Sequence, residues 1–213
     1  MGFYCKHVLP RTIDLAMRNP EATRLREEWL SRATGDVLEV GIGSGLNLRF
    51  YSSKVRCVYG VDPSIELQRK ARERLAGAPL EVRFFTQSAE DPVALPHASI
   101  DTVVVTWSLC SIADATGALR QIKPVLKPEG GLIFLEHGLA PDQSVAAWQH
   151  RLTPLWKRAA GGCHLNRRID TLISGAGFRI IELRTCYLRG LRPMTYTYQG
   201  FAQRMNPDDA RPR

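Results

Sequence analysis

The sequence contains no long apolar run. Its longest apolar stretches, such as Ile100 to Trp107 and Gly131 to Leu135, are much shorter than the ~20 residues that a membrane-spanning helix needs. The segment from Met1 to Pro10 carries Lys6 and His7 and no apolar core of the kind found in secretory signals. We therefore expect neither a membrane span nor export, and we expect a cytoplasmic location.

Cysteines at metal-ligand spacing are also absent. The chain has five cysteines, an odd number, and none of them forms a C-x-x-C pair. This pattern disfavours a zinc site and a disulfide framework, and it suits a reducing compartment. We expect free thiols at Cys5, Cys57, Cys110, Cys163 and Cys186 and no bound metal.

The basic residues form no dense run. The formal net charge is +8 and the isoelectric point is about 9.5, yet the arginines are spread from Arg11 to Arg213. A dispersed pattern is typical of a basic soluble surface, although attraction of the chain to an anionic membrane surface stays open. Charge alone identifies no partner, and the sequence indicates no obligate protein partner.

Strand and helix patterns alternate along a chain of 213 residues, which suits one α/β domain. Short apolar or alternating runs predict strands at Val37–Val40, Arg56–Val61, Leu80–Phe84, Ile100–Trp107, Leu132–Glu136, Phe178–Thr185 and Thr195–Ala202. Charged segments between them predict helices at Glu21–Arg32, Gly45–Tyr51, Ser64–Leu75 and Ala115–Leu126. Proline and paired glycines predict a turn at Lys127–Gly131. The expected architecture is an open, largely parallel sheet.

A glycine-rich loop follows the first predicted strand. Gly41, Gly43 and Gly45 have G-x-G-x-G spacing, which lets the backbone turn tightly and approach a ligand closely. Glu39 before them could neutralise an ammonium group, such as that of S-adenosylmethionine (SAM). A dinucleotide site instead uses G-x-G-x-x-G. An ordinary turn between a strand and a helix stays open as the alternative.

Two more polar elements follow the next two predicted strands. Asp62 ends the second strand, where its carboxylate can accept both hydroxyl hydrogens of a ribose, a feature that dehydrogenases share. The segment Gln87–Asp91 follows the third strand and could offer amides and a carboxylate to an adenine edge, or it could be a solvated turn. Three such elements at successive strand ends favour an adenosyl ligand over packing alone.

At these positions the chain resembles the class I SAM-dependent methyltransferases. The likeness is carried by Glu39–Gly45, Val61–Pro63, Ser88–Glu90 and Leu126–Gly131. It implies a Rossmann-like, doubly wound α/β sheet of seven strands, mostly parallel with the last strand antiparallel. It also implies SAM as the cofactor, bound by Glu39, Gly41, Gly43, Gly45, Asn47, Asp62, Pro63, Ser88, Ala89, Glu90, Thr106 and Trp107.

A closer resemblance is with the animal alkyl thiol methyltransferases, relatives of the quinone and phospholipid methyltransferases. It rests on short motifs that include Leu109–Ser111, Glu136–His137 and Gly162–Leu165. It implies a single domain over residues 1–213, with a helical cap at 1–35, a SAM-binding half at 36–136 and an acceptor-side half at 137–213. Those proteins begin with a hydrophobic anchor that is missing here, although Phe3, Tyr4, Val8, Leu9 and Ile13 could form an apolar flap.

The methyl acceptor is expected at the ends of the fourth and fifth predicted strands. His137 is the candidate catalytic base, although a histidine that only caps a strand end is the alternative. Cys110, Trp148, Cys163 and His164 are the candidate substrate residues, and Trp156 lies in the same segment. The tryptophans could equally pack at helical spacing.

The resemblance favours S-methylation of a small alkyl or aryl thiol by direct displacement. Phosphatidylethanolamine N-methylation is the first alternative, and a non-catalytic SAM-binding protein is the second. A dinucleotide-dependent oxidoreductase is disfavoured by the glycine spacing and by the lack of a Tyr-x-x-x-Lys pair. A nucleic-acid substrate is disfavoured because Thr106–Leu109 replaces an Asn/Asp-Pro-Pro-aromatic motif and the chain has no Pro-Cys dipeptide.

Overall fold

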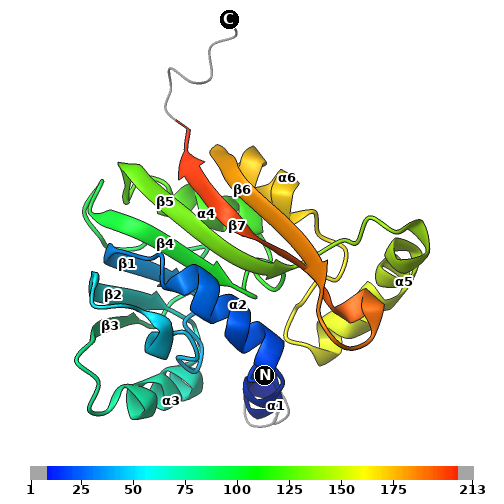
Figure 1. Cartoon of the computed structure of the whole chain (residues 1–213), viewed down its shortest axis with the longest axis horizontal. Helices are drawn as coiled ribbons and strands as arrows, with labels where there is room; N and C mark the ends of the chain where they lie inside the picture. The colour runs from blue at the N-terminus through cyan, green and yellow to red at the C-terminus, as the bar shows by residue number, and fades with distance from the viewer. Residues whose placement is uncertain (1–8, 206–213) are drawn as a thin grey trace, which may run out of the picture.

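The computed structural model describes residues 9–205, and the side chains from Thr12 onward. Seven strands form one sheet in the order β3-β2-β1-β4-β5-β7-β6 (Figure 1). β7 is antiparallel to both of its neighbours, while β1 to β5 pair in parallel. The strands are β1 (Gly35–Val40), β2 (Val55–Val61), β3 (Glu81–Phe85), β4 (Ile100–Thr106), β5 (Leu126–His137), β6 (Phe178–Tyr187) and β7 (Tyr196–Arg204). The predicted seven-stranded α/β fold is confirmed.

Helices connect the strands and begin at polar caps. They are α1 (Leu9–Ala16), α2 (Pro20–Leu30), α3 (Ile65–Leu75), α4 (Ala115–Ile122), α5 (Gln143–Ala159) and α6 (Ile169–Gly175), with short 3₁₀ turns η2 (Leu48–Phe50) and η3 (Arg192–Met194). Asn19, Ser64 and Asp114 each accept a hydrogen bond from a backbone N–H in the first turn of α2, α3 and α4. In the described part of the chain, no helix has both the length and the apolar character needed to cross a membrane.

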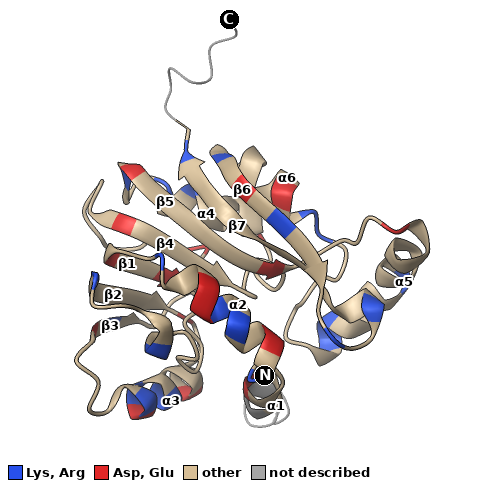
Figure 2. Ribbon diagram, viewed as in Figure 1, with Lys and Arg blue, Asp and Glu red and all other residues tan. Residues whose placement is uncertain are grey.

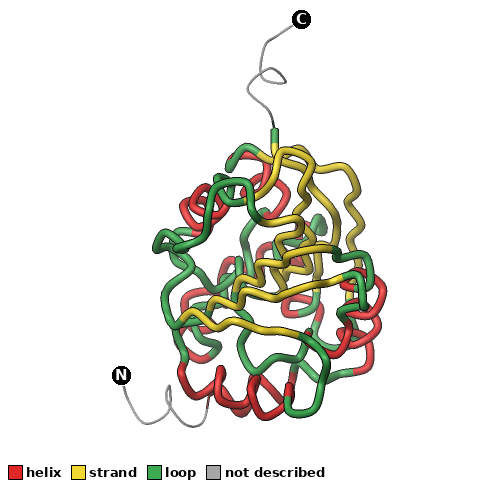
Figure 3. The backbone as a smooth tube through the Cα atoms, turned by 90° about the vertical axis from the view of Figure 1, so that its left-hand side faces the viewer, coloured by secondary structure: helices red, strands yellow, loops and turns green. Residues whose placement is uncertain are grey.

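The sheet separates two apolar layers. On one face, α2 and α3 pack against side chains such as Val37 and Val104. On the other face, α4 and α6 pack against their sequence neighbours Leu38 and Val105. Successive side chains of a strand point to opposite faces, so each buried strand supplies both layers. This explains why the central strands are apolar throughout, and Figure 3 shows the helices on the two sides of the sheet.

Two sequence predictions about local structure were wrong. The expected turn at Lys127–Gly131 belongs to β5, where Ile100 pairs with Leu126 and Thr102 with Gly131 across a bulge. A Cβ on Gly131 would lie 2.1 Å from the Phe201 ring, so this glycine allows close packing rather than a turn. The segment Gly45–Tyr51 contains only the single 3₁₀ turn η2 instead of a full crossover helix.

Candidate functional site

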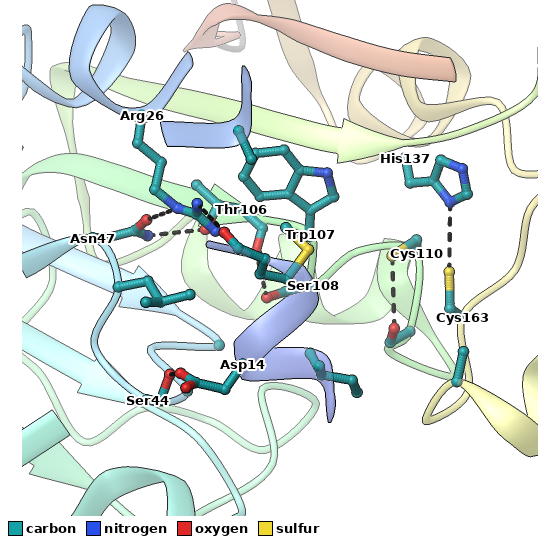
Figure 4. A pocket seen from close by; sticks show the side chains of 18 of the residues that line it. Asp14, Arg26, Ser44, Asn47, Thr106, Trp107, Ser108, Cys110, His137 and Cys163 are labelled. Carbon is teal, nitrogen blue, oxygen red and sulfur yellow. Dashed lines mark hydrogen bonds between the residues drawn. The ribbon is translucent and has the colours of Figure 1, made fainter. Parts of the chain in front are cut away.

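A cavity of about 370 Å³ opens at the carboxyl ends of β1, β2, β4 and β5, beneath α1 (Figure 4). Ligands of open α/β sheets bind at this edge, and the volume suits a small molecule. The predicted site residues that line it are Gly41, Gly43, Asn47, Asp62, Thr106, Trp107, Cys110, His137 and Cys163. Its walls also contain residues that the sequence did not single out as ligands, including Asp14, Arg26, Ser44, Ser108, Ser111, Leu188, Met194 and Thr197.

The glycine loop needs two of its glycines for different reasons. Both Gly41 and Gly43 have positive φ angles, +75° and +53°, which side chains rarely adopt. A Cβ on Gly41 would meet the Ser108 hydroxyl at 2.0 Å, so this position is sterically closed. A Cβ on Gly43 would find no protein atom nearer than 3.8 Å and would occupy cavity space beside Asp62. Gly43 therefore leaves room for a ligand, while Gly41 packs the loop.

Asp62 lies at the end of β2 with its carboxylate on the cavity wall. Its Oδ2 accepts the Gly43 N–H at 2.9 Å and its Oδ1 accepts the Ser64 N–H at 2.8 Å. These bonds fix the carboxylate, and each oxygen still has a lone pair for a ligand hydroxyl. Burial raises the pKa of Asp62, and the two backbone bonds oppose that rise.

Glu39 is buried next to the cavity and does not line it. Its carboxylate accepts hydrogen bonds from the Asn47 amide and the Tyr51 hydroxyl, both at 2.8 Å. Complete burial raises its pKa to about 7, against the opposing effects of these two donors and of the Arg26 charge. Asn47 lies between Glu39 and the cavity, so any influence of Glu39 on a ligand passes through Asn47.

Arg26 places a positive charge in the cavity wall. It is only 4% exposed, its Nε donates to the Asn47 Oδ1 at 2.9 Å, and its Nη1 donates to the Met17 carbonyl at 2.7 Å. The guanidinium also lies 4.7 Å from the centre of the Trp107 ring. Burial lowers its pKa to about 10. In the sequence Arg26 is one of several charged residues on the α2 helix, so nothing marked it as a site residue.

Helix α1 closes one side of the cavity through Asp14. The Asp14 carboxylate accepts hydrogen bonds from the Ser44 hydroxyl and from Arg74, the latter at 2.8 and 3.0 Å. Ile13 and Met17 from the same segment line the cavity. Of the predicted apolar flap, only Ile13 is described in full, because Phe3, Tyr4 and Val8 lie outside the described residues and the side chain of Leu9 does too.

Five predicted donor-site residues other than Glu39 do not line the cavity. Ala89 is buried in the core, and Glu90 accepts the Asp114 N–H at 2.6 Å, with Ser88 bonded to Glu90. A Cβ on Gly45 would meet Leu48 and Ala71, so its role here is close packing. Pro63 also falls outside the cavity wall. Roles for these residues in ligand binding stay predictions.

The acceptor end of the cavity contains an imidazole and two thiols. His137 Nδ1 lies 3.6 Å from the Cys163 sulfur (Figure 4), and the Cys110 sulfur, in the wall of the same cavity, lies 3.6 Å from the Ser111 hydroxyl. The Cys110 thiol and the His137 imidazole lower the pKa of Cys163 although burial opposes them, while the Cys163 thiol and burial raise the pKa of Cys110. His137 Nε2 is buried and has no hydrogen-bond partner within the described structure.

The remaining predicted substrate residues divide between wall and surface. Trp156 lines the cavity from the inner side of α5. Trp148, which lies on the same helix, is 54% exposed and does not line the cavity. His164 is half-buried, with its Nδ1 at 3.2 Å from the Cys110 carbonyl, and it supports the loop from outside the cavity.

Comparison with known proteins identifies the fold and the family. Residues 38–134 match the family described as Methyltransferase domain. The thiol S-methyltransferase TMT1B of Homo sapiens is 32% identical over 84% of this chain and 78% of that protein. The chain belongs to the class I SAM-dependent methyltransferase family. Its Rattus norvegicus relative, thiol S-methyltransferase TMT1B, is 37% identical over 69% of this chain, and the match spans 61% of the rat protein's length.

A solved SAM-dependent methyltransferase from Methanosarcina mazei has the same fold as this methyltransferase chain. Its TM-score is 0.64 at 19% identity, over 80% of this chain and 92% of the other. The family explains why the cavity lies where it does, since the matched residues 38–134 contain the end of β1, all of β2 to β4, the glycine loop and Asp62. His137 and Cys163, which the sequence predicts to lie near the methyl acceptor, are beyond the matched range.

Proposed function

We propose that this methyltransferase chain transfers the methyl group of SAM to the sulfur of a small thiol. The observation that carries the proposal is one continuous cavity. Gly43 and Asp62 line one end of it, and His137 and Cys163 line the other. The thiol S-methyltransferases of rat and human, at 37% and 32% identity, support a thiol as the acceptor.

The donor end of the cavity fits SAM. Asp62 offers two fixed carboxylate oxygens that suit the hydroxyls of a ribose, and the space beside Gly43 would be filled by any side chain there. Arg26 supplies a buried positive charge that suits the carboxylate of an amino acid. When bound, SAM supplies a methyl group on a positively charged sulfur, which activates the methyl for displacement.

The acceptor end suits a thiol that must lose its proton. Free thiols have a pKa near ~8.5, so only a small fraction is thiolate at neutral pH. His137 can take this proton directly, or through Cys163 at 3.6 Å. The thiolate then forms the new sulfur–carbon bond as the bond from the methyl carbon to the donor sulfur breaks. No covalent enzyme intermediate is needed.

The walls around His137 indicate which thiols are accepted. Leu188, Met194 and Trp156 are apolar and line this end of the cavity. Burial of apolar surface favours alkyl and aryl thiols at about 25 cal/mol per Å². We therefore infer that small neutral thiols bind better than charged ones.

The test is a transfer assay with the purified chain, SAM and a matched panel of acceptors. The panel contains a short alkyl thiol, an aryl thiol and phosphatidylethanolamine in vesicles, and mass spectrometry detects each methylated product. We expect methyl thioethers from both thiols and no methylated lipid. Trp148→Ala, outside the cavity, is the control and should leave the rate unchanged. Methylation of the lipid amine alone would contradict the thiol assignment, and SAM binding without any product would favour a non-catalytic protein.

A further inference from the structure

Two cysteines line the cavity, although the proposed methyl transfer by direct displacement uses neither sulfur as a nucleophile. Cys110 follows β4, and Cys163 follows α5, yet both line the same cavity. The main chains also meet there, since the His164 N–H donates to the Cys110 carbonyl at 2.8 Å. A direct contact between the backbones beside two cysteines is the arrangement that a disulfide between them requires.

The structure holds both loops firmly. The Glu136 carboxylate accepts the N–H groups of Ser108 and Leu109 at 2.8 and 3.1 Å, and that of Cys110 at 3.1 Å. On the other side, the Arg167 guanidinium donates to the carbonyls of Leu109, Ile112 and Ala113. Arg167 is only four positions from Cys163, so it ties the Cys110 loop to the Cys163 segment. The two segments that carry the cysteines are therefore held next to each other.

The surroundings distinguish the two thiols. Cys163 is partly exposed to the cavity and touches the imidazole of His137 at 3.6 Å, so its thiolate has a stabilising partner. Cys110 is buried, 3% exposed, and its thiol lies 3.6 Å from the Ser111 hydroxyl. A partly exposed thiolate next to a basic group is the attacking thiol in exchange reactions, and a buried neighbour is the resolving one.

We propose that Cys163 and Cys110 form a thiol–disulfide exchange site that takes small neutral disulfides in the same cavity. The Cys163 thiolate attacks one sulfur of the disulfide RSSR, which forms a mixed disulfide and releases RS⁻. Cys110 then loses its proton, attacks the Cys163 sulfur and releases the second RS⁻. Both leaving groups take up a proton. One disulfide is reduced to two thiols while the cysteine pair is oxidised to one disulfide.

The other two described cysteines lack this arrangement. Cys57 lies buried within β2, and Cys186 lies on β6 where its sulfur accepts a hydrogen bond from Gln199 at 3.5 Å. Neither of them lines the cavity. Cys186 is therefore a matched control, because it is half-buried like Cys163 but has neither the imidazole nor a neighbouring thiol.

The experiment incubates the reduced full-length chain with bis(2-hydroxyethyl) disulfide, without SAM. The wild type should release two thiols per chain, lose two hydrogens in intact mass and yield a linked Cys110–Cys163 peptide. Cys110→Ser should stop at one released thiol, with the hydroxyethylthio group on Cys163. Cys163→Ser should react at least about tenfold more slowly, because its remaining cavity thiol is protonated. Cys186→Ser should behave as the wild type.

Circular dichroism confirms in each case that the variant is folded. A folded wild type that forms no Cys110–Cys163 peptide would overturn the proposal. So would a Cys163→Ser variant that reacts as fast as the wild type, or a Cys110→Ser variant whose adduct is found on Cys57 or Cys186. Because no methyl transfer is measured, these results are independent of the proposed thiol methylation.

Discussion

At the scale of single residues, the cavity sets His137 apart from the other titratable groups near the acceptor. The carboxylate of the adjacent Glu136 already accepts hydrogen bonds from three backbone N–H groups, and Asp62 lies at the opposite end of the cavity. His137 instead faces a thiol at 3.6 Å and has a free lone pair or proton in either tautomer. These contacts support the proposed role of His137 as the group that exchanges a proton with the acceptor.

Replacing this imidazole tests that role. His137→Gln keeps a polar side chain of similar reach but removes the base, and general-base contributions are typically about 10²- to 10⁴-fold. We expect kcat for a small thiol to fall by about that factor while the affinity for SAM stays within about threefold. The measurement is kcat against pH, in which the variant should recover activity as pH approaches the thiol pKa near ~8.5. An unchanged kcat at pH 7 would contradict the role.

Glu39 predicts a pH dependence of stability. Its pKa in the folded protein is raised by burial from 4.5 to about 7, so folding favours the protonated form. The stability from this neutral carboxyl is fully present below pH 4.5 and is lost as pH rises through about 7. Glu39→Gln removes the titration, so its free energy of unfolding relative to wild type should rise by up to about 3 kcal/mol between pH 4.5 and pH 8.

Urea unfolding at several pH values measures this difference. Parallel wild-type and Glu39→Gln curves across that range would show that Glu39 does not titrate as described. Glu28→Gln, an exposed change on α2, is the control for a carboxylate that is not buried. The hydrogen bonds of Glu39 also show what the sequence could not reveal when it indicated this residue as a direct ligand. The motif shows an acidic residue at the strand end, but not that Asn47 and Tyr51 occupy both of its oxygens.

At the scale of secondary-structure elements, α1 depends on a few polar contacts for its position over the cavity. Asp14 is bound by Ser44 of the glycine loop, by Arg74 of α3 and by Arg18, which belongs to the same segment as α1. Figure 2 shows that basic and acidic residues gather on α2 and α3 near this point. Because Arg18 is part of the same segment as Asp14, the ion pair with Arg74 at 2.8 Å is the one that ties α1 to α3.

Arg74→Ala should therefore loosen α1 without unfolding the sheet. Hydrogen exchange in Leu9–Ala16 should become faster, and the affinity for S-adenosylhomocysteine should fall by about tenfold, because α1 closes the cavity. Arg69→Ala on the same helix is the matched control, since Arg69 is largely exposed and its ion pair with Glu73 spans 3.9 Å. Equal exchange rates in α1 for both variants would mean that Asp14 does not hold the helix.

The sheet could be predicted from sequence to a large degree because its strands are short apolar runs bounded by polar residues. Val37–Val40 and Ile100–Trp107 became β1 and β4 with small shifts at their ends. The β5 bulge could not be predicted, since Pro128 and two glycines are the usual sign of a turn and only the Phe201 ring explains Gly131. Arg26 and Asp14 were missed because their roles arise from contacts distant in sequence.

At the scale of the whole molecule, residues from both predicted halves of the chain, 36–136 and 137–213, line one cavity. The donor end is built from the glycine loop and Asp62, which sequence spacing could reveal. The acceptor end is assembled from the ends of β4, β5 and α5, so its two thiols and imidazole come from positions 110, 137 and 163. Only the fold brings these residues together, and the sequence could name them only through a family resemblance.

The donor end underlies every functional statement about the chain, and calorimetry with S-adenosylhomocysteine and NADH tests it most directly. Wild type and Glu28→Gln, an exposed change on α2 outside the cavity, should bind S-adenosylhomocysteine with micromolar affinity and should not bind NADH. Asp62→Asn should weaken that binding by about tenfold to a hundredfold, because hydrogen bonds to a charged group contribute roughly 1.5 to 3 kcal/mol. Binding of NADH in place of S-adenosylhomocysteine, or full affinity in Asp62→Asn, would contradict the account.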